Sequence, residues 1–405
     1  MMLRRFAYLA LVSFVLVAHG CSIKTPPKVV IDKTPRFEPL KDQEAEILAA
    51  HLSTRLQDLE SWSALKPGLE DSLNYIVRRP QNAICVKRPG LTLTWGQLGD
   101  SVAEMIGLLP DLDRDPRLVA ERFQWLKVAP GTLLTGYYEP WLEASLVPDD
   151  TYKYPLYGVP DDLKTIHLNA FHPRWKGQSL VYRMGEDGIE PYYDRESIDG
   201  DGALHGKGHE IAWTKSPVDI FFLQIQGSGR LQMDDGSTRH ILYAGKNGRR
   251  FVAIGKYLIN GGHVAREDMS MQKIRAFLKA NPTTAQELMF KDPSYVFFSL
   301  ADEGPYGAMS TILTPRVSAA VDRTMIPLGS VLALKTAFMD YEKGETDPFM
   351  SLVLAQDTGG AIKNTRMDLF CGTGEGAEDL AGHLLEDSEV FMLVSKRVMK
   401  AISGD

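Results

Sequence analysis

The feature that most limits how this chain can fold is a change in its sequence pattern at about Lys127. From this point, short runs rich in β-branched and aromatic residues alternate with glycine, proline and aspartate. Such runs are typical of strands joined by tight turns, so this part is predicted to be mainly β. The predicted strands lie in TLLTGYYEPWL, YPLYGV, SLVYRM, DIFFLQIQGSG, RHILYAG and, after Pro293, SYVFFSL, AAVDRTMIPLGSVLALKTAF, FMSLVLAQDTGG, RMDLFCG and EVFMLVS. Between the two groups, GRRFVAIGKYLIN and MSMQKIRAFLKANP have helical spacing.

The part of the chain before Lys127 is predicted to be helical. The segments AEILAAHLSTRLQDL and LEDSLNYIVRR repeat apolar residues at helical spacing. Thr94 and Gln97 match a capping box, and Asp115-Pro116 suits the start of a helix through PRLVAERFQWL. Because 405 residues exceed what one ordinary core contains, we expect two domains.

The N-terminus has the pattern of an export signal. A basic flank precedes the apolar run Phe6–Ala18, which is too short to span a bilayer comfortably. We predict a signal peptide over residues 1–21 with Cys21 as the lipidated residue; an ordinary cleaved signal with an incidental cysteine is the alternative. Ser22 follows Cys21, and in a Gram-negative cell this favours a location of the lipidated protein at the periplasmic face of the outer membrane. A chain without lipid would be secreted to the periplasm. Residues 22–42 are rich in proline and lysine and predict an extended tether.

Composition and cysteine spacing exclude several classes of protein. A net charge of −7 and a pI near 5.8 argue against a nucleic-acid binder. Cys85 and Cys371 can pair in an oxidising compartment only if they meet in space, so both the paired and the free state stay open. Neither belongs to a CxxC motif, and the acidic and histidine spacings do not match calcium or zinc motifs. These spacings argue against a metal site, and no metal, nucleotide or redox cofactor is implied.

Aspartates follow or precede predicted strands at three turns. Asp357 ends an apolar run and is followed by Gly359 and Gly360, while Asp322 and Asp368 lie beside similar turns. If these strands close into a barrel, the three carboxyls can converge, and their mutual repulsion raises the pKa of at least one of them. A carboxyl that stays protonated near neutral pH can act as a general acid. The alternative is that aspartates simply accept backbone hydrogen bonds in turns.

A second polar group lies in the predicted strand DIFFLQIQGSG. Strand alternation places Gln224 and Gln226 on one face, followed by the turn Gly227, Ser228 and Gly229. Primary amides donate and accept hydrogen bonds, which suits sugar hydroxyl and acetamido groups. These five residues are therefore candidates for substrate contacts; an exposed strand and hairpin turn without function is the alternative.

The segment GYYEP provides two further candidates. Tyr137 belongs to a series of tyrosines that can line a saccharide groove, although such residues also pack small β-cores. Glu139 is the carboxylate that rivals Asp357 as a catalytic group.

Together, these segments resemble the membrane-bound lytic transglycosylase A family. The matching pieces are GYYEP, YPLYGVP, PYYDRESID, DIFFLQIQGSGRL, YAGKNG, PSYVFF, AAVDRTMIPLGS, AQDTGGAIK and MDLFCGTG, in the family's order from about Gly136 to the C-terminus. The last pieces resemble the three-aspartate domain, whose name refers to the positions of Asp322, Asp357 and Asp368. One difference is Asn364, where the family usually has glycine; asparagine also tolerates left-handed backbone angles, so we expect the turn to persist.

The resemblance implies a mainly β fold with N-terminal helices and two domains. A double-psi β-barrel domain would be assembled from residues 43–135 and 291–405, with the three-aspartate region at about 305–375. A smaller β-rich domain, residues 136–290, would be inserted into it, and a groove would lie between the two.

The resemblance also implies an enzyme that cleaves the β-1,4 bond between N-acetylmuramic acid and N-acetylglucosamine of peptidoglycan. Cleavage within glycan strands and cleavage from their ends both stay open. The product would be a 1,6-anhydro sugar, with Asp357 as the single general acid and base, supported by Asp368 and Asp322. The implied partners are glycan strands and, through the lipid, the outer-membrane surface, with a monomeric chain. Two alternatives stay open: a conventional hydrolase with Glu139 or Asp322 as second carboxylate, and a non-catalytic wall-binding lipoprotein.

Overall fold

The computed structural model describes residues 34–266, 269–340 and 344–403. The predicted signal segment, Cys21 and the tether up to residue 33 lie outside the described residues. Within the described part of the chain, no helix is both long enough and apolar enough to cross a bilayer.

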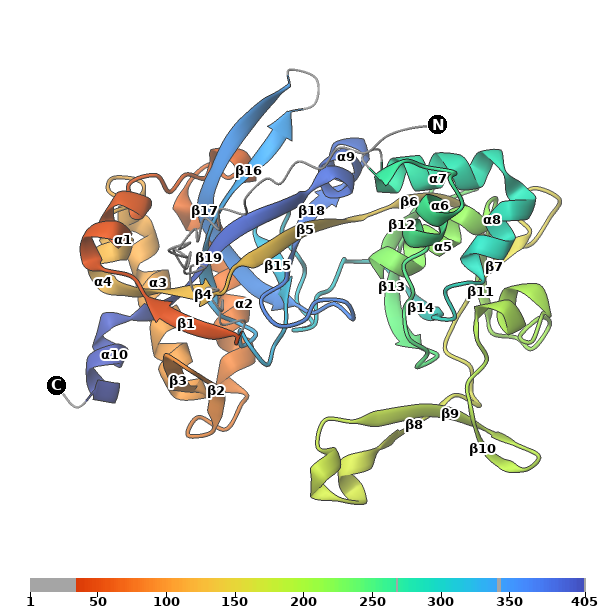
Figure 1. Ribbon diagram of the computed structural model, residues 1–405, viewed down its shortest axis with the longest axis horizontal. Helices are drawn as coiled ribbons and strands as arrows, with labels where there is room; N and C mark the ends of the chain where they lie inside the picture. Colours follow the sequence, from red (N-terminus) through yellow and green to blue (C-terminus); the bar gives the residue numbers. More distant parts are fainter. Residues whose placement is uncertain (1–33, 267–268, 341–343, 404–405) are drawn as a thin grey trace, which may run out of the picture. The chain divides into compact units, whose positions relative to one another are not determined.

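A closed β-barrel is the central element of the described structure (Figure 1). Its six strands follow one another around the ring, and the last, β19, pairs back with the first, β5. In ring order they are β5 (Thr132–Glu139), β18 (Met367–Thr373), β15 (Ser318–Val321), β17 (Glu345–Asp357), β16 (Val331–Asp340) and β19 (Leu385–Ser395). Beyond β19, the sheet continues with β4 (Phe123–Ala129) and β1 (Arg36–Pro39). The mainly β class is confirmed, but the predicted tether is too long, because residues 36–39 pair with β4.

Helices and a hairpin accompany the barrel. They are α1 (Asp42–Ala49), α2 (Lys66–Val77), α3 (Trp95–Leu112), α4 (Leu118–Arg122), α9 (Glu375–His383), α10 (Lys396–Ser403), the short 3-10 helices Arg55–Gln57 and Trp62–Leu65, and the hairpin β2 (Ile84–Arg88) and β3 (Leu91–Thr94). The predicted capping box is confirmed: Gln97 Oε1 accepts from the Thr94 N–H at 2.9 Å, and Thr94 Oγ1 accepts from the Gln97 N–H at 3.3 Å. The predicted helix PRLVAERFQWL ends early, at Arg122, because the following residues pair in β4.

Strand β17 shows how the barrel holds a carboxylate at its end. Residues 349–356 are all buried, as expected for a strand covered on both faces. Gln356 is buried too, and it donates to Gly68 O of α2 at 2.9 Å and accepts from Ser318 Oγ of β15 at 2.6 Å. These two bonds fix the backbone one residue before Asp357.

Between β5 and β15 the chain forms a second sheet with its own core, here called the insert. Its strands, in spatial order, are β7 (Tyr154–Tyr157), β11 (Glu210–Thr214), β6 (Trp141–Ser145), β12 (Gly229–Met233), β13 (Thr238–Lys246) and β14 (Val296–Ala301). Its helices are α5 (Pro217–Gln226), α6 (Gly255–Asn260), α7 (Met271–Ala280), α8 (Pro282–Met289) and the single π-turn Glu196–Gly200. Because β14 pairs with β13, the insert sheet reaches Ala301, and the predicted boundary at residue 291 is too early.

The segment DIFFLQIQ is helix α5, and its prediction as a strand is wrong. Pro217 occupies the first turn, Ser216 Oγ accepts from the Asp219 N–H at 3.3 Å, and Gly227 ends the helix with φ of 88°. The physical reason is that α5 is buried on two sides. Phe221 and Phe222 pack into the core formed with the other insert helices, whereas Leu223 packs under the insert sheet. A helix enclosed in this way has no polar face, so it lacks the periodicity that identifies surface helices.

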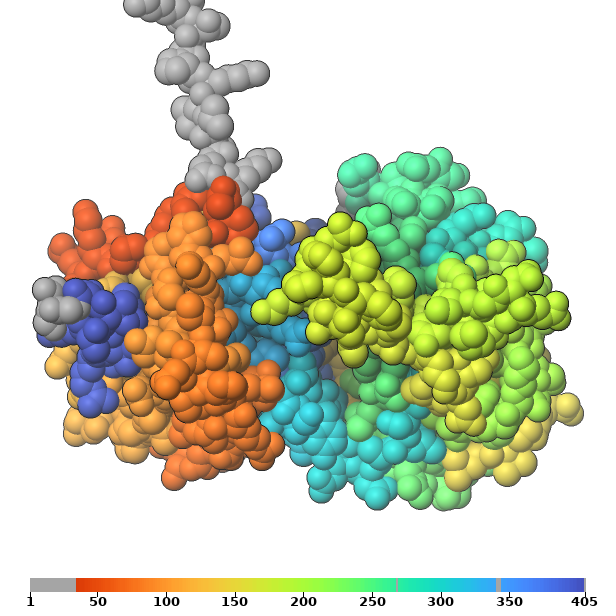
Figure 2. Space-filling view, turned by 90° about the horizontal axis from the view of Figure 1, so that it is seen from below, coloured from red at the N-terminus to blue at the C-terminus, as the bar shows by residue number. Residues whose placement is uncertain are grey.

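A smaller sheet, here called the arm, spans residues 163–191. It consists of β8 (Lys164–His167), β9 (Ser179–Gly185) and β10 (Gly188–Pro191), with short 3-10 turns at Leu168–Ala170 and Pro173–Trp175. The prediction of a strand at SLVYRM is confirmed by β9. In Figure 2, no other described segment covers the side of the arm that faces the viewer.

Candidate active site

Asp357 is the last residue of β17, and both of its carboxyl oxygens are held. Oδ1 accepts from the backbone N–H of Ala308 at 2.9 Å, and Oδ2 accepts from the hydroxyl of Tyr137 at 2.8 Å. Burial raises the pKa of Asp357, while hydrogen bonds from Thr358, Tyr137 and Ala308 act in the opposite direction, and the raised pKa prevails. The carboxyl is therefore held in one orientation, and its raised pKa favours the protonated form.

Tyr137 comes from β5 and packs against Phe370, with the ring centroids 5.3 Å apart. Burial and the nearby charges of Asp357 and Asp368 hold the pKa of its phenol well above 10. The hydroxyl therefore stays protonated at physiological pH and serves as a permanent hydrogen-bond donor to Asp357.

Asp368 lies on the same row of the barrel sheet as Asp357. Ala320 of β15 is the register partner of Asp357 on one side and of Asp368 on the other. Two strand spacings separate the two backbones by about 9–10 Å. The pairing of β15 with β17 has a register shift between Ala319 and Ala320, directly beside Asp357. Asp368 Oδ1 accepts from Thr135 Oγ1 at 2.8 Å.

The environment of Asp368 also favours its neutral form. Its pKa is raised to about 6, mainly by burial and also by the charge of Asp357, although the bond from Thr135 and the charge of Arg366 act to lower it. Because the charge of Asp357 is one of the causes that raise the pKa of Asp368, the two carboxyls repel each other when both are ionised.

Asp322, the third aspartate, has a different position. Its Oδ1 accepts from the N–H and hydroxyl of Thr324 at 2.9 and 2.8 Å, and its Oδ2 accepts from the Asn364 N–H at 2.8 Å. Although burial acts to raise its pKa, the bonds from Asn364 and Thr324 hold it below the usual range. Asp322 thus fixes the turn between β17 and β18, where Asn364 has the left-handed φ of 58° anticipated from the sequence.

Glycines allow close approach around Asp357. A Cβ on Gly307 would lie 2.7 Å from Gln356 O, so only glycine lets the loop bring the Ala308 N–H to the carboxyl. A Cβ on Gly359 would lie 2.6 Å from Ile362, whereas Gly360 faces open space. The sequence analysis singled out Gly359 and Gly360 as candidates but not Gly307 and Ala308, because a backbone donor has no side-chain signature.

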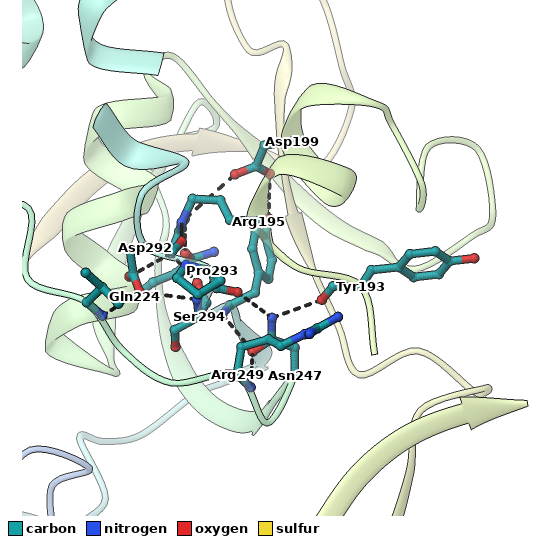
Figure 3. Close-up of polar contacts among 11 residues, drawn as sticks. Tyr193, Arg195, Asp199, Gln224, Asn247, Arg249, Asp292, Pro293 and Ser294 are labelled. Atoms are coloured by element: carbon teal, nitrogen blue, oxygen red, sulfur yellow. Dashed lines mark hydrogen bonds and ion pairs between the residues drawn. The ribbon is translucent and has the colours of Figure 1, made fainter. Parts of the chain in front are cut away.

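Gln224 was predicted as a sugar contact, and the structure contradicts this. It is only 7% exposed, because it lies on the inner side of α5. Its Oε1 accepts from Arg195 Nη1 at 2.5 Å, within a buried network drawn in Figure 3. Arg195 also donates to Asp292 O at 3.0 Å and Ser294 O at 2.6 Å, so the network ties α5 to the loop before β14.

Gln226 and the following turn lie closer to the barrel. Gln226 is partly exposed, and its Oε1 accepts from the Tyr138 N–H of β5 at 3.0 Å. Gly227 and Ser228 are partly exposed, whereas Gly229 is buried against Pro140. Of this predicted group, Gln226, Gly227 and Ser228 are accessible, while Gly229 is not.

Glu139 is fully enclosed, with no exposed surface. Its Oε2 accepts from Arg230 Nε at 2.7 Å, and its Oε1 lies 3.0 Å from His240 Nδ1. A buried carboxylate held by two partners is a structural ion pair. The position contradicts the prediction of Glu139 as a substrate contact or an open second carboxylate.

The cysteines of the described residues are not bonded to each other. Cys85 and Cys371 are both free thiols, with Cys371 buried. Among the described residues, no group of three or more histidine, cysteine, aspartate or glutamate side chains is arranged to hold a metal ion.

The comparisons with known proteins agree with this arrangement of segments. A family model described as the MltA specific insert domain matches residues 133–299, and one described as the 3D domain matches residues 317–394, which include all three aspartates. A crystal structure of the membrane-bound lytic murein transglycosylase from Agrobacterium tumefaciens is 31% identical, with a TM-score of 0.68 over 87% of this chain and 98% of that chain. This chain belongs to the membrane-bound lytic murein transglycosylase A family.

Other members of the transglycosylase A family are similarly related. The Vibrio cholerae protein is 33% identical over 64% of this chain and 65% of its own length, and the Escherichia coli protein is 32% identical over 64% of each. The match thus spans slightly less than two thirds of these relatives. A structure of Escherichia coli MltA with bound chitohexaose has a TM-score of 0.65 at 25% identity, over 89% of this chain and 94% of that chain.

Proposed function

We propose that this chain is a peptidoglycan lytic transglycosylase in which Asp357 is the single general acid and base. The observation that carries the proposal is the state of Asp357: its pKa is raised, and both oxygens are oriented by fixed donors. Family membership supports the choice of peptidoglycan, as does the chitohexaose bound by the Escherichia coli relative.

The reaction needs one carboxyl because the nucleophile belongs to the substrate. Asp357 gives its proton to the glycosidic oxygen, the bond from that oxygen to C1 of the muramic residue breaks, and positive charge develops on the ring. Asp357, now a carboxylate, takes the proton of the C6 hydroxyl, and that oxygen forms a bond to C1. The result is the 1,6-anhydro sugar. The attack is entropically favoured because both atoms belong to one sugar.

The neighbours of Asp357 tune this cycle. Burial favours the protonated form of Asp357 before the reaction, and an ionised Asp368 would favour it further through the repulsion that raises its own pKa. Tyr137 and Ala308 stabilise the carboxylate formed by proton transfer. Asp322 supports the site indirectly through the turn that it fixes. Gln226 and Ser228 are the accessible residues that we propose as sugar contacts.

The architecture that we propose around this site follows the family. The closed barrel would have double-psi topology, the insert would be a second domain, and the glycan would bind in a groove between them. Lipid on Cys21 would place a monomeric chain on the periplasmic face of the outer membrane.

A conventional hydrolase is the second candidate, and it requires another open carboxylate to activate water. The enclosed position of Glu139 and the turn-fixing bonds of Asp322 count against it. A non-catalytic wall-binding protein has no need for a carboxyl whose pKa is raised.

Mass spectrometry of the products tests the proposal. The protein would be incubated with purified peptidoglycan beside Asp357→Asn and the matched surface variant Asp302→Asn, whose side chain is 89% exposed. We expect products one water lighter than those of hydrolysis from the wild type and Asp302→Asn, and none from a folded, glycan-binding Asp357→Asn. Reducing-end products would indicate a hydrolase. Binding without any product from the wild type would leave a wall-binding module, and loss of folding in Asp357→Asn would refute its catalytic assignment.

A further inference from the structure

One face of the arm is apolar and exposed. Leu180 on β9 is the register partner of Ile166 on β8, and Met184 on β9 is the partner of Ile189 on β10. Leu180 and Met184 are four residues apart on one strand, so they point to the same face of the sheet, and each register partner points to the same face as its mate. All four side chains therefore lie on one face. Leu180 is 52% exposed, Met184 64% and Ile189 63%.

The opposite face of the arm is different. Arg183 of β9 forms an ion pair with Glu190 of β10 there, and Val181 lies close to Gly248 of the insert. The arm therefore has one face that contacts other side chains and the insert, and one apolar face that has no partner among the described residues. A contiguous apolar face of this kind marks a binding surface on a soluble protein.

Cations gather at the end of the arm where β8 and β9 are joined. Residues 163–185 contain four cations and no aspartate or glutamate, whereas Glu186 and Asp187 form the turn between β9 and β10 at the other end. Lys164, Arg174 and Lys176 form no ion pair within the described residues, and Arg174 instead stacks on Trp175 at 4.7 Å. Phe171, at the turn between β8 and β9, is 63% exposed. Exposed apolar and aromatic side chains next to unpaired cations suit the interface of an anionic bilayer.

We propose that the apolar face of the arm docks on the surface of a lipid bilayer that contains anionic lipids. A second copy of the chain fits less well when the β8–β9 ends of two arms meet, because this pairing would bring their cations together. A bilayer meets both requirements, since it accepts the apolar side chains and neutralises the cations. The predicted lipid on Cys21 would keep the body near such a surface, because residues 22–33 span at most about 40 Å when fully extended.

Vesicle co-sedimentation tests this docking. Residues 34–405 form a compact unit, so they can be made without the predicted anchor. We expect them to sediment with vesicles of phosphatidylethanolamine and phosphatidylglycerol, and far less with phosphatidylcholine alone or at high salt. Each surface cation contributes about fivefold to the partition coefficient, so replacing Lys164, Arg174 and Lys176 by glutamine should lower it about hundredfold.

Apolar substitutions separate docking from a general charge effect. The double variant Met184→Ser and Ile189→Ser should bind roughly tenfold more weakly or worse, because it removes two inserted side chains. The matched control is Ile47→Ser on α1, which changes an equally exposed apolar residue (57%) and should bind like the wild type. Absence of vesicle binding, equal binding by the double variant, or a dimer abolished by the double variant would each overturn the proposal. None of these outcomes depends on catalytic activity.

Discussion

Replacing Tyr137 by phenylalanine isolates one hydrogen bond at the proposed catalytic carboxyl. The Tyr137 hydroxyl donates to Asp357 Oδ2 at 2.8 Å, and the ring is held independently by Phe370. The substitution removes the donor while keeping the ring, so we expect the fold to survive. Since the bond stabilises the carboxylate more than the acid, its loss makes Asp357 a weaker acid.

The size of the effect follows from the kind of bond. A hydrogen bond to a charged group contributes about 1.5–3 kcal/mol. With about 1.4 kcal/mol per factor of ten in rate, kcat should fall about tenfold to hundredfold. The sign of the pH effect is also fixed: the reaction needs protonated Asp357, so kcat falls as pH rises through its pKa. Losing the donor raises that pKa, and the alkaline limb of the pH profile should move to higher pH even as the maximal rate falls.

The assay is release of anhydro products from peptidoglycan across a pH series. The matched control is Tyr138→Phe, one residue along β5, whose hydroxyl accepts from Arg275 at 2.9 Å and does not contact Asp357. Its alkaline limb should coincide with that of the wild type. If Tyr137→Phe lowers kcat but leaves the limb in place, the hydroxyl does not bond to Asp357 in the active enzyme, and the reasoning fails.

Two further substitutions test the roles of buried carboxyls. Asp368→Asn should move the alkaline limb of kcat to lower pH, the opposite of Tyr137→Phe, because it removes a negative neighbour of Asp357; an unmoved limb would rule out their coupling. The same variant should have a free energy of unfolding about 3 kcal/mol above that of the wild type at pH 8 and equal to it near pH 3. The reason is that the Asp368 pKa of about 6 exceeds its value in the unfolded chain, so ionisation of Asp368 destabilises the folded wild type at high pH only. Denaturant titrations at both pH values measure this difference. Glu139→Gln should lower the free energy of unfolding by about 3–5 kcal/mol, because it leaves Arg230 without its buried partner, while the folded fraction keeps its alkaline limb. A stable Glu139→Gln that no longer turns over would instead support the hydrolase.

The sequence was most informative where one local pattern determines the structure. The apolar run before Asp357 and the glycines after it predicted the end of the strand correctly, because burial on both faces demands uninterrupted apolar residues. The capping box at Thr94 was equally local and is present.

Predictions failed where the environment comes from distant segments. Glu139 looked like a free carboxylate because its partners, Arg230 and His240, are about a hundred residues away. Gln224 looked accessible because α5 is enclosed on two sides and has no polar face to reveal its helical period. The Ala308 N–H that donates to Asp357 is a backbone group, so it cannot be predicted from the residue type.

The way in which the barrel closes also determines when the chain can fold. Strand β5 pairs with β18 and β19, and Thr135 of β5 contacts Met367, 232 residues later. During synthesis β5 therefore waits for its partners until almost the whole chain is available, whereas the insert sheet draws its strands from residues 141–301 and can form earlier. Pairing over such sequence distances makes folding slow and leaves strand edges unprotected in the meantime. A chain that stays open in this way would remain competent for the predicted passage across a membrane, and one that lacks β19 would never shield the edge of β5.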